Sequence, residues 1–214
     1  MNIKFYTYFW IFIFGSAFGV ISESIWRLVT RGVFVARLGV LYGPFNPVYG
    51  IALVIMTLIL VRFSNRNILF LVLFGALFGG GFEYLASFLQ EFLFGTVSWD
   101  YSKFAYNING RVNIPYIILW GLLCTVWIKV FYPVFIDFIG KMPLKPRIFV
   151  TYVMMIFMIF NVTVSGAAVY RGSQRAQNIP AHNSVEVYLD NHYPDAFLSE
   201  IYKNMKQPHT KKLT

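Results

Sequence analysis

The sequence is poor in charged residues and almost free of cysteine. Charged residues make up 13% of its 214 positions, whereas soluble domains carry roughly 25%, so a soluble enzyme is nearly excluded. The single cysteine, Cys124, lies in an apolar block and can therefore form neither an internal disulfide nor a metal cage. All three histidines lie beyond residue 170, and we expect no metal site.

Several motifs of catalytic sites are also missing from the sequence. It contains no Gly-x-x-x-x-Gly-Lys-Ser/Thr phosphate loop, so any ATP hydrolysis would have to come from a partner. Neither His-Glu-x-x-His nor Gly-x-Ser-x-Gly occurs. These absences weigh against an enzyme, and we expect no cofactor.

Long hydrophobic runs, in contrast, are abundant. Hydrophobic residues account for 57% and aromatic residues for 20% of the chain. A hydrocarbon core about 30 Å thick takes about 20 apolar residues at a rise of 1.5 Å each. We therefore predict an all-α, multi-pass helical bundle in the cell membrane. Its five transmembrane helices fall at about 5–27, 47–63, 67–93, 113–137 and 148–170.

The chain divides by composition into a membrane domain, 1–170, and a polar tail, 171–214. Within the tail, Phe197, Ile201 and Met205 recur every four residues, which predicts a short amphipathic helix at about 195–206. A simple solvated tail is the alternative. We expect one further stabilising feature, an Asn-Pro start at 46–47, where the asparagine caps the second helix.

The chain is basic, with 18 basic and nine acidic residues and a formal charge of +9. In a membrane protein such a balance indicates loops facing anionic lipid rather than a nucleic-acid site, so the bilayer is the expected partner. The basic residues divide nearly evenly between the two sets of loops. The orientation in the membrane therefore stays open.

One pattern occurs twice. Phe-Gly-x-x-Phe-Gly-x-x-x-Glu stands at 14–23 and again at 74–83, and Gly-x-x-Asn-x-x-Tyr stands at 43–49 and again at 110–116. A repeat unit of two helices keeps the same direction in both copies, which predicts an axis along the membrane normal. The alternative is that glycine patterns common in membrane helices arose independently.

A spacing of four places the glycines and the glutamate of each copy in one stripe of a helix. We expect these glycines to let the first and third helices touch, which would bring Glu23 and Glu83 toward one axis. Glu83 lies about 22 Å along its helix, inside the hydrocarbon core, and needs a cation, a water-filled cavity or a proton. The helix-packing glycines are Gly15, Gly19, Gly75 and Gly79.

Polar loop residues gather at the same end of the bundle as the two glutamates. The candidate polar mouth consists of Glu23, Arg27, Arg37, Tyr42, Glu83, Asp100, Asn107, Asn109 and Arg111. One interpretation is structural, with Glu23 paired to Arg27, and Glu83 paired to Arg37 or Arg111. The other is a polar cavity that binds a solute, an ion or a lipid head group, with arginines as partners for anions.

Six motifs carry a resemblance to a known family. They stand at 19–23, 41–50, 83–87, 99–102, 107–111 and 120–122. With them the sequence resembles the bacterial family described as Putative ABC-transporter type IV. Where members tend to have tryptophan after the first of these glycines and cysteine before the loop proline, this chain has Val20 and Asn46. A thiol-based role for that loop is therefore not available.

The resemblance implies a permease-like component that moves or binds a small solute or lipid without an ATPase of its own. Such a component would need a separate ATPase subunit or a second copy of the chain. One alternative is a membrane-embedded enzyme acting on a lipid or lipid-linked substrate, with Glu83 or Asp100 as general base and Arg111 steering a head group. Another is a non-catalytic scaffold or accessory protein. The substrate stays open.

Overall fold

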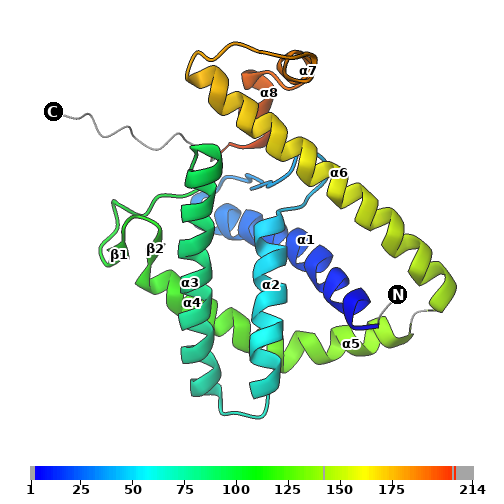
Figure 1. Ribbon diagram of the computed structural model, residues 1–214. Helices are drawn as coiled ribbons and strands as arrows, with labels where there is room; N and C mark the ends of the chain where they lie inside the picture. The colour runs from blue at the N-terminus through cyan, green and yellow to red at the C-terminus, as the bar shows by residue number, and fades with distance from the viewer. Residues whose placement is uncertain (1–2, 142, 204, 206–214) are drawn as a thin grey trace.

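The computed structural model describes residues 3–141, 143–203 and 205, and its framework is helical (Figure 1). The α-helices are α1 (Ile3–Arg31), α2 (Pro47–Leu60), α3 (Ile68–Phe94), α4 (Ile114–Val126), α5 (Tyr132–Lys141), α6 (Leu144–Ala176), α7 (Ser184–His192) and α8 (Asp195–Ile201). A short antiparallel pair of strands, β1 (Asn107–Ile108) and β2 (Val112–Asn113), precedes α4. The expected all-α fold is confirmed.

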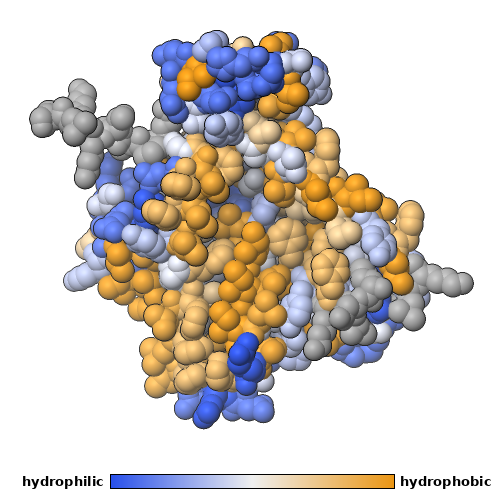
Figure 2. Space-filling view, in the orientation of Figure 1, coloured by the Kyte–Doolittle hydropathy of each residue, from blue (hydrophilic) through white to orange (hydrophobic). Residues whose placement is uncertain are grey.

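Four segments are long and apolar enough to cross a membrane: Phe5–Thr30, Ile68–Phe94, Ile114–Lys141 and Pro146–Ala176. The remaining expected segment is a shorter apolar helix, because the 14 residues of α2 continue only through the 3₁₀ turn η1 (Val61–Phe63). Figure 2 shows apolar side chains over most of the centre of the visible face, and hydrophilic ones over α7 and α8 at the top, at the opposite end, and at the left near the β1–β2 loop. The chain is a multi-pass helical membrane protein.

The four glycines of the repeated pattern pack helices together, but not the helices that we expected. A Cβ atom at Gly79 would lie 2.6 Å from Trp120 of α4, and one at Gly75 would lie 2.9 Å from Cys124. Gly15 and Gly19 face Leu53 and Tyr49 of α2 in the same way. The main contacts thus join α1 to α2 and α3 to α4. The expected glycine contact between the first and third helices is wrong, because each stripe receives large side chains from the helix that follows it.

The two copies of the loop motif also have the same local structure. Gly43 and Gly110 both have positive φ angles, 76° and 68°. The side-chain amide of Asn46 donates to the carbonyl of Arg37 at 3.2 Å, and that of Asn113 donates to the carbonyl of Ala105 at 2.8 Å. Each asparagine thereby ties the start of a helix to the loop before it. The axis that relates the two copies stays a prediction.

Proline lies near the start of α2 and near the break between α4 and α5. Asn46 caps α2 by accepting from the N–H of Val48 at 3.1 Å, as predicted. Between α4 and α5 the chain widens into the π-helical segment η2 (Trp127–Phe131), where the N–H of Tyr132 donates to the carbonyl of Trp127. Pro133 follows directly, and because proline cannot donate and crowds the preceding turn, the wider turn accommodates its ring.

The C-terminal part of the chain is more structured than the sequence indicated. Helix α6 continues to Ala176, past the boundary expected at 170, and α7 was not predicted. Helix α8 covers the start of the expected amphipathic helix, of which residues 204 and 206 lie outside the described residues. Tyr193 and Leu198 pack with Ala168 of α6, so α7 and α8 fold back onto the end of α6 (Figure 1).

Candidate functional site

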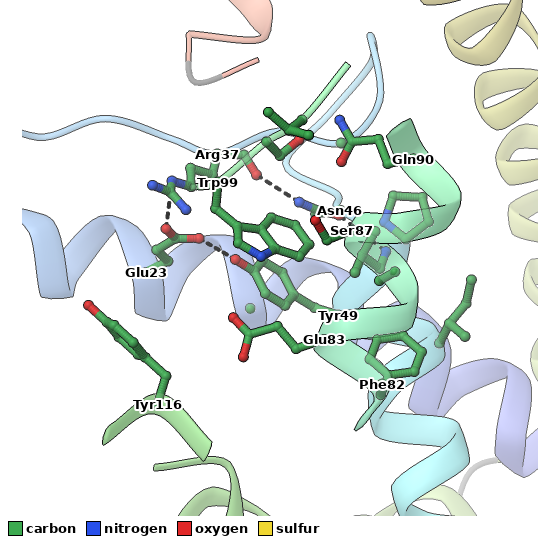
Figure 3. Close-up of a pocket in the computed structure, with 18 of the residues that line it drawn as sticks. Glu23, Arg37, Asn46, Tyr49, Phe82, Glu83, Ser87, Gln90, Trp99 and Tyr116 are labelled. Atoms are coloured by element: carbon green, nitrogen blue, oxygen red, sulfur yellow. Dashed lines mark hydrogen bonds and ion pairs between the residues drawn. The ribbon is translucent and has the colours of Figure 1, made fainter. Parts of the chain in front are cut away.

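A large cavity opens between the two helix pairs. Its volume is about 2290 Å³, and α1, α2, α3, α4 and α6 all contribute to its lining. Seven of the nine residues expected at the polar mouth line it: Glu23, Arg27, Arg37, Glu83, Asp100, Asn109 and Arg111. Tyr42 and Asn107 are not among the lining residues. Figure 3 shows Glu23 and Glu83 reaching into this space from α1 and α3.

Glu23 is fixed by an arginine from the loop that follows α1. Its Oε1 lies 2.7 Å from Nε of Arg37 and 3.9 Å from Nε of Arg27. The hydroxyl of Tyr49, on α2, donates to Oε2 of the same carboxylate (Figure 3). The expected pair with Arg27 is thus the weaker of two. The arginines thus balance the charge of the Glu23 carboxylate, and its contacts join α1, α2 and the loop.

Glu83 has a different environment, with neutral donors only. Its side chain is buried on α3, and the whole residue is 9% exposed. Oε1 accepts from the hydroxyl of Tyr101 at 2.9 Å, and Oε2 accepts from the indole N–H of Trp120 at 3.1 Å. Among the described residues no lysine, arginine or histidine nitrogen lies within 4.0 Å of this carboxylate. The expected ion pair with Arg37 or Arg111 is therefore wrong.

The reason is that both arginines are bound to other glutamates. Arg37 pairs with Glu23, and Arg111 pairs with Glu91, two turns beyond Glu83 on α3. Nη1 of Arg111 also donates to the hydroxyl of Ser87 at 3.3 Å, and its guanidinium lies 5.5 Å from the ring centre of Phe88. Arg111 thus fastens the loop before α4 to the end of α3.

The remaining polar residues of the loop before α4 form hydrogen bonds that fold the loop in which Tyr101 lies. Asp100 accepts from the N–H of Ser102 at 2.8 Å, and Asn107 accepts from the N–H of Gly110 at 2.8 Å. Asn109, with a positive φ of 53°, forms the β1–β2 turn and donates to the hydroxyl of Tyr84 at 3.0 Å. Their contacts are those of a folded turn.

Tyr101 is the member of this loop that reaches the buried acid. The N–H of Tyr101 donates to the carbonyl of Gly110 at 2.7 Å, and its ring stacks on Tyr116 with ring centres 5.1 Å apart. Burial and the nearby Glu83 carboxylate raise the pKa of Tyr101 above its ordinary value. The phenol therefore stays protonated and serves as a donor.

Tyr42 lies in another part of the molecule. Its hydroxyl is 2.8 Å from that of Tyr193, in the tail. The side-chain amide of Asn161, on α6, accepts from the N–H of Tyr42 at 3.1 Å and donates to its carbonyl at 2.7 Å. Tyr42 thus connects the first loop to α6 and the tail, and its contacts are structural.

Four residues of these hydrogen bonds and ion pairs were not chosen from the sequence. They are Tyr49, Glu91, Tyr101 and Trp120. A signal existed for three of them, because Tyr49, Tyr101 and Trp120 all stand in the motifs that carry the family resemblance. Glu91 shares the helical stripe of Glu83, since it lies eight residues further along α3.

Four helices of spanning length around a cavity with a buried carboxylate define a multi-pass membrane protein with an internal polar site. The chain belongs to the family described as Putative ABC-transporter type IV, whose family model matches residues 10–166. The matched region contains both helix pairs and most of α6. No curated protein and no solved structure matches the chain significantly.

Proposed function

We propose that this chain is a permease-like membrane component that binds a small solute or lipid in the cavity between its two helix pairs. The family description supports a role in transport. Because the sequence has no phosphate loop, a separate ATPase subunit would supply the energy. The bacterial cell membrane is the corresponding location.

One observation carries this proposal: Glu83 is buried beside a large cavity and has only neutral partners among the described residues. Placing an acid at the centre of a membrane helix costs roughly 2.5–3.5 kcal/mol on insertion scales, and such residues usually serve binding or transport. A purely structural acid would gain from an arginine, as Glu23 does from Arg37. A ligand site accounts for an acid without one.

The size of the membrane domain supports a partner. Four helices of spanning length and one shorter apolar helix are few for a complete pathway. A second copy of the chain or a different membrane subunit would complete it. Copurification of an ATPase with the tagged full chain would support the transport assignment directly.

The test compares Glu83→Gln with Arg111→Ala, using membrane abundance, thermal stability and rescue of a deletion strain. Glu83→Gln should keep normal abundance and a similar melting temperature but should lose rescue. Its amide oxygen can accept from the indole N–H of Trp120, and its amide NH2 can donate to the hydroxyl of Tyr101. Arg111→Ala should lose stability, because it leaves Glu91 without its cation. Asp100→Asn should keep rescue if Asp100 only shapes its turn.

Other outcomes would favour the other functions. If Glu83→Gln loses stability as strongly as Arg111→Ala, the polar mouth is a clamp and the chain is a scaffold. If the purified chain converts a lipid to a new product in a Glu83-dependent manner, it is an enzyme. Either result would contradict the proposed function.

A further inference from the structure

The two glutamates of the cavity occupy matched positions in the two helix pairs. Each lies four residues after a glycine, Gly19 or Gly79, that receives an aromatic side chain from the next helix. That aromatic side chain, Tyr49 or Trp120, also donates a hydrogen bond to the glutamate. The helix pairs therefore present their acids to the cavity in the same way.

The loops complete the two sites differently. In the first pair the loop supplies a cation, because Nε of Arg37 lies 2.7 Å from the carboxylate of Glu23. In the second pair the loop supplies the neutral hydroxyl of Tyr101, 2.9 Å from the carboxylate of Glu83. Only the second site lacks a positive charge among the described residues.

We propose that an alkylammonium group of the ligand binds Glu83 and takes the position that Arg37 takes at Glu23. This assignment rests on the proposed function, since it names the ligand class of the same cavity. Each carboxylate oxygen can accept more than one hydrogen bond, and among the described residues each oxygen of Glu83 has one donor, Tyr101 or Trp120. Acceptor capacity is therefore left for an N⁺–H donor from the cavity.

The surroundings of Glu83 suit an organic ammonium better than a metal ion. Tyr49, Tyr101, Tyr116 and Trp120 all line the cavity, and Figure 3 shows Tyr49 and Tyr116 beside the space in front of Glu83. Aromatic faces attract ammonium groups, whereas hard metal ions need several oxygen ligands. The described residues contain no group of three or more metal-binding side chains.

Alkylammonium groups occur in soluble amines and in lipid head groups, and the experiment distinguishes these sources. The purified full chain is titrated in micelles with butylamine or with its neutral isostere butanol. In parallel it is reconstituted in nanodiscs of phosphatidylglycerol with or without phosphatidylethanolamine. Tryptophan fluorescence reports binding, because the indole of Trp120 donates to the acid that binds the amine.

We expect saturable binding of an amine probe that is weakened at least tenfold by Glu83→Gln and unchanged by Asp137→Asn. Asp137 is a matched control because this acid of α5 is 63% exposed, pairs with Lys141 and does not line the cavity. Binding of butylamine without binding of phosphatidylethanolamine identifies a soluble amine as the source, and binding of phosphatidylethanolamine identifies a lipid. Four results would overturn the proposal: butanol has the same effect as butylamine, Glu83→Gln binds the amine as well as the wild type, sodium chloride alone gives a Glu83-dependent response, or neither amine gives a response.

A second variant tests the same proposal if Glu83→Gln folds poorly. Tyr101→Arg supplies a loop cation to Glu83, as Arg37 does to Glu23. It should abolish amine binding and preserve thermal stability, whereas Tyr101→Phe should retain amine binding. Retained binding in Tyr101→Arg would contradict the proposal. If amines bind Glu83 but Glu83→Gln still rescues the deletion strain, the proposed transport function is wrong and the proposed ligand class is supported. If Glu83→Gln loses rescue but amines do not bind, the ligand class is wrong and the transport function is supported.

Discussion

At the scale of single residues, an aromatic side chain serves each glutamate of the cavity in two ways. The ring of Tyr49 fills the space beside Gly19, and its hydroxyl donates to Glu23. Trp120 does the same for Gly79 and Glu83. A hydrogen bond to a charged acceptor is stronger than one between neutral groups. These residues therefore couple the packing of a helix pair to the placement of its acid.

Tyr49→Phe separates the two roles, because it keeps the ring and removes the hydroxyl. We expect the free energy of unfolding to fall by about 1.5–3 kcal/mol, the usual contribution of a hydrogen bond to a charged group. Thermal and denaturant unfolding in micelles would measure it. Tyr188→Phe, on the exposed face of α7, is the control and should change little. Equal stability of the two variants would contradict the role assigned to the Tyr49 hydroxyl.

At the scale of helices, the close contact of α3 with α4 depends on a missing side chain. Gly79→Leu should destabilise the protein by about 2 kcal/mol or more, because a Cβ atom there would lie 2.6 Å from Trp120 and the helices would have to separate. Thermal unfolding in micelles is the measurement. Gly81→Leu is the matched control on the same helix, since a Cβ atom at Gly81 has no neighbour within 4 Å. Similar melting temperatures for both variants would argue against this packing.

The helices themselves were largely predictable from the sequence, but their partners were not. Charge-free runs and the Asn46-Pro47 start located the membrane helices because these features act within one segment. The spacing of the glycines defined the stripes on α1 and α3. It carried no information about which neighbour had the complementary Tyr49 or Trp120, so the expected contact between α1 and α3 was wrong.

The same limit applied to the ion pairs and to the tail. Glu23 and Glu83 line one cavity, but the glycine contact between α1 and α3 from which their convergence was expected is absent. The choice of Glu23 and Glu91 as partners of the two loop arginines depends on the folded loops. Helix α7 is short and polar, so its sequence shows only a weak hydrophobic periodicity. Its start nevertheless carries a local signal, because Asn183 caps the N–H of Glu186, whose carboxylate accepts from the N–H of His182.

At the scale of the whole molecule, α7 and α8 are fastened to the end of α6 by ion pairs. Nη2 of the buried Arg171 lies 2.8 Å from Asp190, and Arg175 bridges Asp190 and Asp195 at 2.5 Å and 2.6 Å. Residues just beyond α8, among them Tyr202 and Met205, line the cavity. Docking of the tail therefore also completes one wall of the candidate site.

This attachment should weaken in acid. Hydrogen bonds from Arg171 hold the pKa of Asp190 below its ordinary value of about 3.9. A lowered folded-state pKa gives stability that is present above the ordinary value and is lost as the pH falls through the lowered one. We expect the protection of the backbone amides of α7 and α8 against hydrogen exchange, relative to the intrinsic exchange rate at each pH, to fall below about pH 4. Asp190→Asn should show fast exchange already at neutral pH and a smaller change with acid than Asp137→Asn; identical profiles would contradict this attachment.

The central claim is our proposal that Glu83, which lines the cavity between the helix pairs, binds a ligand there. Native mass spectrometry of the full chain released from its own membranes tests it most directly, because it detects a bound molecule of any chemical class by its mass. We predict a bound solute or lipid that the wild type and Asp137→Asn retain and that Glu83→Gln loses. The same bound mass at the same occupancy in all three proteins would contradict the account.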